Sequence, residues 1–134
     1  MEFVEKDINE QLNRELSHSA YEMAQMGNFN KYTIWVYGKE GPIPHFHFIS
    51  NDKEGCIQLN KNEYFSHSGK VAKLSHLERK ELIEFLQKPS NELPNVSNWQ
   101  LLIATWNLNN PQHRIDTKTP MPNYHLIRGF KENK

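Results

Sequence analysis

The sequence predicts an α+β fold, in which a small antiparallel sheet of three to five strands has helices packed on one face. Short runs of β-branched and aromatic residues lie between residues 32 and 67, and their connections are too short for helical crossovers. From residue 75 the apolar residues follow a helical period. With 134 residues, 37% of them hydrophobic, the chain can form one core. We therefore expect a single domain at 1–110, with its core at 31–109, and a C-terminal arm at 111–134.

The N-terminal part of the chain has the spacing of an amphipathic helix. Apolar residues recur every three or four positions between residues 7 and 26, at Ile8, Leu12, Leu16, Ala20 and Met23. Gly27 and Asn28 follow and are typical of a helix end. The pattern predicts a helix over residues 7–26.

Four runs predict the strands. The segment 32–37 is dense in β-branched and aromatic residues, and the segment 45–49 follows it after a turn at 39–42, so the two form a hairpin. Segments 56–59 and 64–67 predict the third and fourth strands. Alternation along 45–49 places His45 and His47 on one face, with Phe46 and Phe48 on the other. The lone Cys56 is expected to be a small buried strand residue.

Two helices and the arm follow the sheet. Ser75 and Glu78 form a capping box that begins one helix, which ends near residue 88 before a proline. The apolar positions of the next helix are Trp99, Leu102, Ile103 and Trp106. The segment 111–134 has five basic residues against two acidic ones, and also several apolar residues. We expect this arm to pack on its own sheet as an extra strand, with exchange between subunits of a homo-oligomer as the alternative.

Charge and cysteine content limit the function classes. Sixteen basic and sixteen acidic side chains cancel, so no overall field attracts nucleic acid or an anionic membrane, and neither is an expected partner. The aromatic residues of the strands are expected in the core rather than in a base-stacking surface. The acidic N-terminus does not resemble a secretory signal, and the single cysteine suits a reducing compartment. These features predict a cytoplasmic protein.

The compact polar motif of the sequence is Pro44-His45-Phe46-His47, with His67 as its expected companion from a nearby strand. Histidines at i and i+2 lie about 7 Å apart at Cα, close enough for both rings to reach one ion. Zinc needs a third protein ligand, for which Glu54, Glu63 and His67 are the candidates. The glutamate spacing does not match that of cupin sites. Two alternatives are imidazoles on a half-solvated sheet face that bond to neighbours or water, and acid–base chemistry.

Two resemblances involve the same motif. The segment 44–49 is similar to part of the histidine-triad nucleotide hydrolase motif, but its third histidine position is Ile49. Residues 31–109 more closely resemble a family of small bacterial proteins defined as a domain of unknown function. The shared features are the aromatic strand, the Pro-His-Phe-His segment at Pro44 to His47, and a closing helix with tryptophan. This resemblance implies a compact α+β domain from toxin–antitoxin-like or mobile-element contexts.

The sequence thus predicts a non-catalytic binding protein whose partner is another protein, contacted by Pro44, His45, His47 and His67. No cofactor is part of this prediction. The alternative is a metal- or histidine-dependent hydrolase that uses the same three histidines, with zinc or another divalent metal as cofactor.

Overall fold

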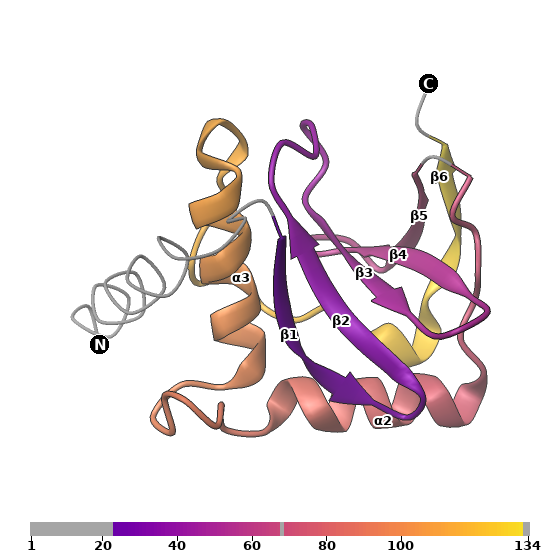
Figure 1. The fold of residues 1–134 in the computed structure, drawn as a ribbon, viewed down its shortest axis with the longest axis horizontal. Coiled ribbons are helices and arrows are strands. Elements are labelled where there is room, and N and C mark those ends of the chain that lie inside the picture. The colour runs from indigo at the N-terminus through magenta and orange to yellow at the C-terminus, as the bar shows by residue number, and fades with distance from the viewer. Residues whose placement is uncertain (1–22, 68, 133–134) are drawn as a thin grey trace.

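The computed structural model describes residues 23–67 and 69–132, which form a six-stranded sheet with two α-helices (Figure 1). The strands follow one another across the sheet in the order β1-β2-β3-β4-β5-β6. The strands are β1 (Met23–Phe29), β2 (Tyr32–Tyr37), β3 (His45–Ile49), β4 (Glu54–Gln58), β5 (Glu63–Ser66) and β6 (Arg128–Glu132). The helices are α2 (His76–Gln87), α3 (Asn98–Asn109) and the short 3₁₀ turns η1 (Pro111–His113) and η2 (Tyr124–Leu126).

The predicted α+β class is confirmed. Strands β1 to β5 pair antiparallel, and the two helices pack against the sheet. The sheet has six strands, one more than the upper limit expected, because residues predicted as the end of a helix lie in β1. The strand from the C-terminal arm, β6, pairs parallel with β5. The arm therefore adds an extra strand to its own sheet in this structure, as the sequence favoured.

The predicted N-terminal helix is wrong over its last residues, and its other residues, 7–22, lie outside the described part. Residues 23–26 belong to β1, which forms a hairpin with β2 through Asn30 and Lys31. Asn30 takes the left-handed conformation that such a turn needs, with φ of 51°. Gly27 lies at a bulge in β1, where an added Cβ would come within 2.5 Å of the Phe85 ring. Pairing and contact with α2 thus override the helical spacing.

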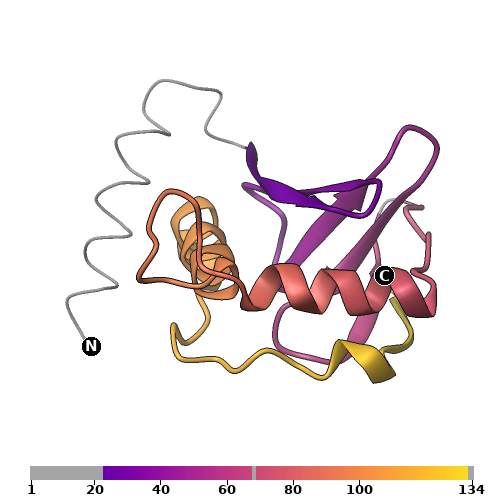
Figure 2. The same cartoon turned by 90° about the horizontal axis from the view of Figure 1, so that it is seen from below.

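The core lies between the sheet and the helices. Tyr32, Ile34 and Phe48 from the strands join Leu82 of α2 and Trp106 of α3 in one cluster of buried side chains. Seen from below, α2 crosses the molecule while α3 is viewed nearly end-on (Figure 2). Cys56 is fully buried in β4, as predicted.

Both helices begin with a capping box. Ser75 and Glu78 cap α2 as predicted, and Ser97 forms the same arrangement with Gln100 at the start of α3. These caps fix the start of each helix. Among the described residues, no helix is both long and apolar enough to cross a membrane.

The C-terminal arm contributes to the core. Tyr124 is fully buried, and its hydroxyl donates a hydrogen bond to the Gln58 carbonyl oxygen at 2.6 Å. The amide of Asn62 donates to the Leu126 carbonyl oxygen at 2.8 Å. These contacts hold the arm beside β4 and β5, so that β6 can complete the sheet.

Candidate metal centre

Strand β3 places two histidines side by side. His45 and His47 lie on the same strand face, with ring centroids 5.1 Å apart, and each is 1% exposed. Pro44 precedes them and is buried, and its carbonyl oxygen accepts a hydrogen bond from the Leu59 amide at 2.9 Å. The sheet on both sides of β3 therefore fixes the backbone that carries both imidazoles.

Glu40 comes from the connection between β2 and β3. Its Oε1 lies 2.5 Å from His47 Nε2 and 3.3 Å from His45 Nε2. Its backbone amide donates to Asn110 Oδ1 at 3.0 Å, and the Asn110 amide group donates to the Tyr37 carbonyl oxygen at 3.0 Å. Asn110 at the end of α3 thus fixes the turn that directs Glu40 toward the histidines.

His67, just beyond β5, completes the cluster. Its Nε2 lies 2.8 Å from Oε2 of Glu40. One ligand atom from each of Glu40, His45, His47 and His67 lies within 4.8 Å of the others. Three imidazoles therefore surround one carboxylate. Their side chains range from fully buried at His45 to 19% exposed at His67.

The outer nitrogen of each β3 histidine is Nδ1, the one that does not face Glu40, and in both residues it already has a hydrogen-bond acceptor. His45 Nδ1 lies 2.7 Å from the Ile43 carbonyl oxygen, and His47 Nδ1 lies 3.1 Å from Oε2 of Glu54. An Nδ1–H that donates to these oxygens leaves Nε2 as the nitrogen that faces Glu40. His45 Nε2 is buried and has no aligned hydrogen-bond partner among the described residues. A lone pair on this buried nitrogen needs a proton or a cation.

The electrostatics favour an ionised carboxylate at the centre. Burial by itself would raise the pKa of Glu40, but the imidazoles of His45 and His47 outweigh it and hold the pKa well below its usual value. Burial raises the pKa of the Cys56 thiol, and its sulfur faces the outer nitrogen of His47 at 3.4 Å. Glu40 is thus available as an anionic ligand, whereas Cys56 is protonated and lies outside the cluster.

This donor set suits a borderline divalent ion. Imidazole nitrogen and carboxylate oxygen bind Zn²⁺ at about 2.0–2.2 Å, which places tetrahedral ligand atoms about 3.3 Å apart. The closest separations here, 2.5 and 2.8 Å, are hydrogen-bond contacts, so ring and carboxylate shifts of roughly 1 Å would open the centre to an ion. Iron and manganese also accept such ligands.

The sequence identified three of these four residues. His67 joins His45 and His47 as predicted, but Glu54 contacts the outer nitrogen of His47, and Glu63 is not in the cluster. The expectation of imidazoles on a half-solvated face is wrong for His45 and His47, because both are buried. Glu40 was missed because it lies in a turn. Its spacing of five residues before His45 was the available signal.

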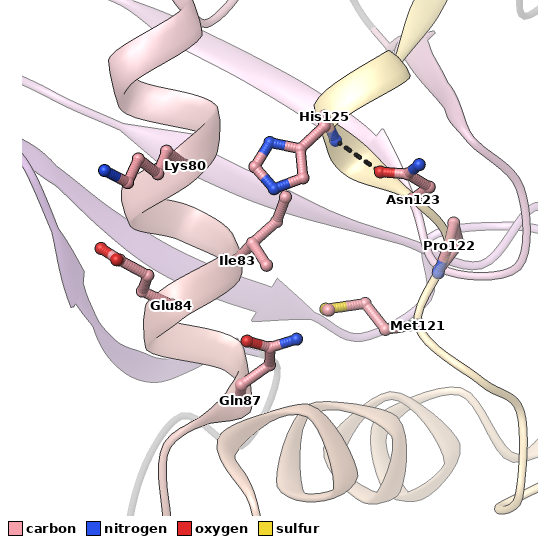
Figure 3. Close-up of a pocket in the computed structure, with 8 residues that line it drawn as sticks. All are labelled: Lys80, Ile83, Glu84, Gln87, Met121, Pro122, Asn123 and His125. Carbon is pink, nitrogen blue, oxygen red and sulfur yellow. Dashed lines mark hydrogen bonds between the residues drawn. The ribbon is translucent and has the colours of Figure 1, made fainter.

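Apart from the cluster, a hollow of about 410 Å³ lies between α2 and residues 121–125 (Figure 3). Its polar side chains, which include Lys80, Glu84 and His125, are exposed, and only Ile83 among its lining residues is buried. None of its polar side-chain atoms is among the buried unpartnered atoms of the described residues. It is therefore a surface groove that has no buried polar group to bind a ligand among its described lining residues.

The fold and the cluster define an α+β protein with a candidate metal centre. Comparisons with protein-family models, with curated proteins and with solved structures find no match. The resemblance to the small bacterial family with the Pro-His-Phe-His segment therefore stays a prediction.

Proposed function

We propose that this protein binds a divalent transition metal, with zinc as the leading candidate, through Glu40, His45, His47 and His67. The observation that carries the proposal is the convergence of three imidazoles on the Glu40 carboxylate, whose side chain is 10% exposed, with ligand atoms within 4.8 Å. The buried Nε2 of His45 supports it, because Glu40 Oε1 lies 3.3 Å away without forming an aligned hydrogen bond, and a buried polar atom that lacks one is costly in a merely structural network.

Burial supports this proposal over the contact surface predicted from the sequence. Side chains that are 1% exposed, as in His45 and His47, have almost no area to offer a macromolecular partner. A protein partner that contacts other surfaces stays a prediction. The same burial suits a metal centre, because it strengthens the attraction between the cation and Glu40.

The test is metal binding by untagged, chelator-treated protein. We expect one Zn²⁺ or Co²⁺ per chain by calorimetry, and visible absorption bands from Co²⁺ as its ligand set forms. Zinc at 100 times its dissociation constant would add about 2.7 kcal/mol to the folding free energy. For 134 residues that corresponds to a rise in melting temperature of about 10 °C.

Two variants make the test specific. His67→Gln removes the most exposed of the three imidazoles, so it should fold, and it should bind Zn²⁺ at least 10-fold more weakly. His125→Gln removes an exposed histidine outside the cluster and should bind as the wild type does. Absence of stoichiometric metal on the wild type, or equal loss in both variants, would overturn the proposal.

The hydrolase alternative from the sequence is the catalytic form of the same proposal. The side chains of Glu40 and His67 are 10% and 19% exposed, so solvent reaches this edge of the cluster. The catalytic form would need one of the four residues to leave a coordination position free, where a zinc ion held by the other three would activate a water molecule. Zinc-loaded protein should then cleave activated phosphate or carboxylate esters, and His67→Gln should abolish the turnover. Metal binding without turnover on either ester class would remove the catalytic form and leave the binding function.

A further inference from the structure

The contacts outside the candidate metal centre indicate how it is held. Glu54 on β4 accepts a hydrogen bond from His47 Nδ1 at 3.1 Å, while His47 Nε2 faces Glu40. The two nitrogens of one imidazole therefore have different roles. A carboxylate on the outer nitrogen fixes the ring orientation and makes the inner nitrogen a stronger donor to a metal.

Lys70 holds Glu54 in place. Its Nζ lies 3.0 Å from the same Oε2 that faces His47, and 5.9 Å from the centre of the Tyr37 ring. The Tyr37 ring packs on His47 with centroids 4.4 Å apart. Burial by itself would lower the pKa of Lys70, but the hydrogen bond to Glu54 and its charge outweigh this effect and raise it. Lys70 is therefore a permanent cation beside Glu54.

The candidate ligand His67 and the lysine that holds Glu54 lie close together in the chain. The Lys70 amide donates to the His67 carbonyl oxygen at 3.0 Å, and the two residues form an isolated β-bridge. The Ala72 amide also donates to the Glu54 carbonyl oxygen at 3.2 Å. Glu54, Lys70 and His67 are thus linked by main-chain and side-chain contacts, so a change at Glu54 reaches two of the metal-facing imidazoles.

We propose that Glu54, held by Lys70, is the positioning residue of the metal centre and sets its affinity without binding the ion. This inference rests on the proposed metal binding. It assigns Glu54 a role different from that of a ligand, which the sequence alone left open. The contacts of Glu54 and Glu40 with different nitrogens of the His47 ring fit these two roles.

Glu54→Ala removes the acceptor, and Glu54→Gln keeps an acceptor oxygen but removes the charge. We expect the dissociation constant for Zn²⁺ to rise 10- to 100-fold in the alanine variant and by less in the glutamine variant. Lys70→Met should weaken binding in the same direction. Glu63→Gln is the matched control, because Glu63 lies on β5 outside the cluster, and its binding should equal that of the wild type.

The Co²⁺ spectrum separates positioning from ligation. At saturating Co²⁺, Glu54→Ala should keep the position and intensity of the wild-type bands, whereas His67→Gln should change them. Wild-type affinity in Glu54→Ala would overturn the positioning role while metal binding stands. A changed Co²⁺ spectrum in Glu54→Ala would also overturn it, because Glu54 would then be a ligand. A wild type that binds neither Zn²⁺ nor Co²⁺ would overturn both proposals.

Discussion

Asn110 joins the end of α3 to the turn that carries Glu40, and replacing it tests this part of the structure. Its side chain accepts from the Glu40 amide at 3.0 Å and donates to the carbonyl oxygens of Tyr37 at 3.0 Å and Trp106 at 3.3 Å. Asn110 is 3% exposed, so water does not readily replace these contacts. Asn110→Ala leaves the Glu40 amide and the Tyr37 carbonyl group without these partners.

The expected loss of stability in Asn110→Ala follows from the number of hydrogen bonds removed and from their burial. A net hydrogen bond contributes about 1 kcal/mol, and a buried group left unpaired costs about 1–3 kcal/mol. We therefore expect Asn110→Ala to lower the free energy of unfolding by about 2–4 kcal/mol. The entropy of unfolding is about 2.1 cal/mol/K per residue, so 134 residues give a fall in melting temperature of about 7–14 °C.

The assay is urea unfolding followed by tryptophan fluorescence, with a thermal melt by circular dichroism, on metal-free protein. The matched control is Asn109→Ala, one position earlier in α3, where the side-chain nitrogen has no hydrogen-bond partner among the described residues. Because Asn109→Ala removes a buried nitrogen that forms no hydrogen bond, that variant should not lower the free energy of unfolding. Equal losses in the two variants would refute the reasoning, because the tether between α3 and the Glu40 turn would then contribute nothing.

Three further predictions concern the sheet and its buried groups. Gly55→Ala would place a Cβ 2.5 Å from the Ala72 carbonyl oxygen, so chemical denaturation should show a loss of about 1–3 kcal/mol; an unchanged midpoint would contradict this packing. Tyr124→Phe should cost about 1–3 kcal/mol, because the Gln58 carbonyl oxygen loses its buried donor. Burial raises the pKa of Tyr124 well above its usual value, so its contribution to stability is complete below the unfolded-state value of about 10 and is lost as the pH rises above it. The stability difference between wild type and Tyr124→Phe should therefore shrink between about pH 9 and 11 in urea titrations, and a constant difference would contradict the raised pKa. Cys56 is fully buried, so a thiol reagent should label it only at the rate of unfolding, whereas rapid labelling of folded protein would place it at the surface.

Local patterns predicted most of the secondary structure. The β-branched run at 32–37, the alternating segment at 45–49 and the capping box at Ser75 and Glu78 all formed the predicted elements. Each of these signals acts over a few residues, where sterics and capping dominate. The helix predicted for residues 23–26 is wrong because these residues pair with β2, a contact that a local pattern does not report.

The candidate site also contains some residues that local patterns predict and others that they do not. His45 and His47 were found because two residues on one strand face are neighbours whatever the fold does elsewhere. The sequence also predicts His67 as their companion, because it lies on a nearby predicted strand. Glu40 was missed, because its direction depends on Asn110, which is 70 positions away in the sequence. Glu54 was grouped with the ligand candidates, since the sequence does not show which nitrogen of His47 it faces.

The sequence by itself determined the α+β class, the elements with strong local patterns and the pair of histidines on β3, because these depend on periodicity and short-range chemistry. Only the tertiary structure decided that β6 pairs parallel with β5, that β1 is a strand and that Glu40 lies among three imidazoles. These outcomes depend on contacts between distant segments, whose free energies exceed local preferences of a few tenths of a kcal/mol per residue.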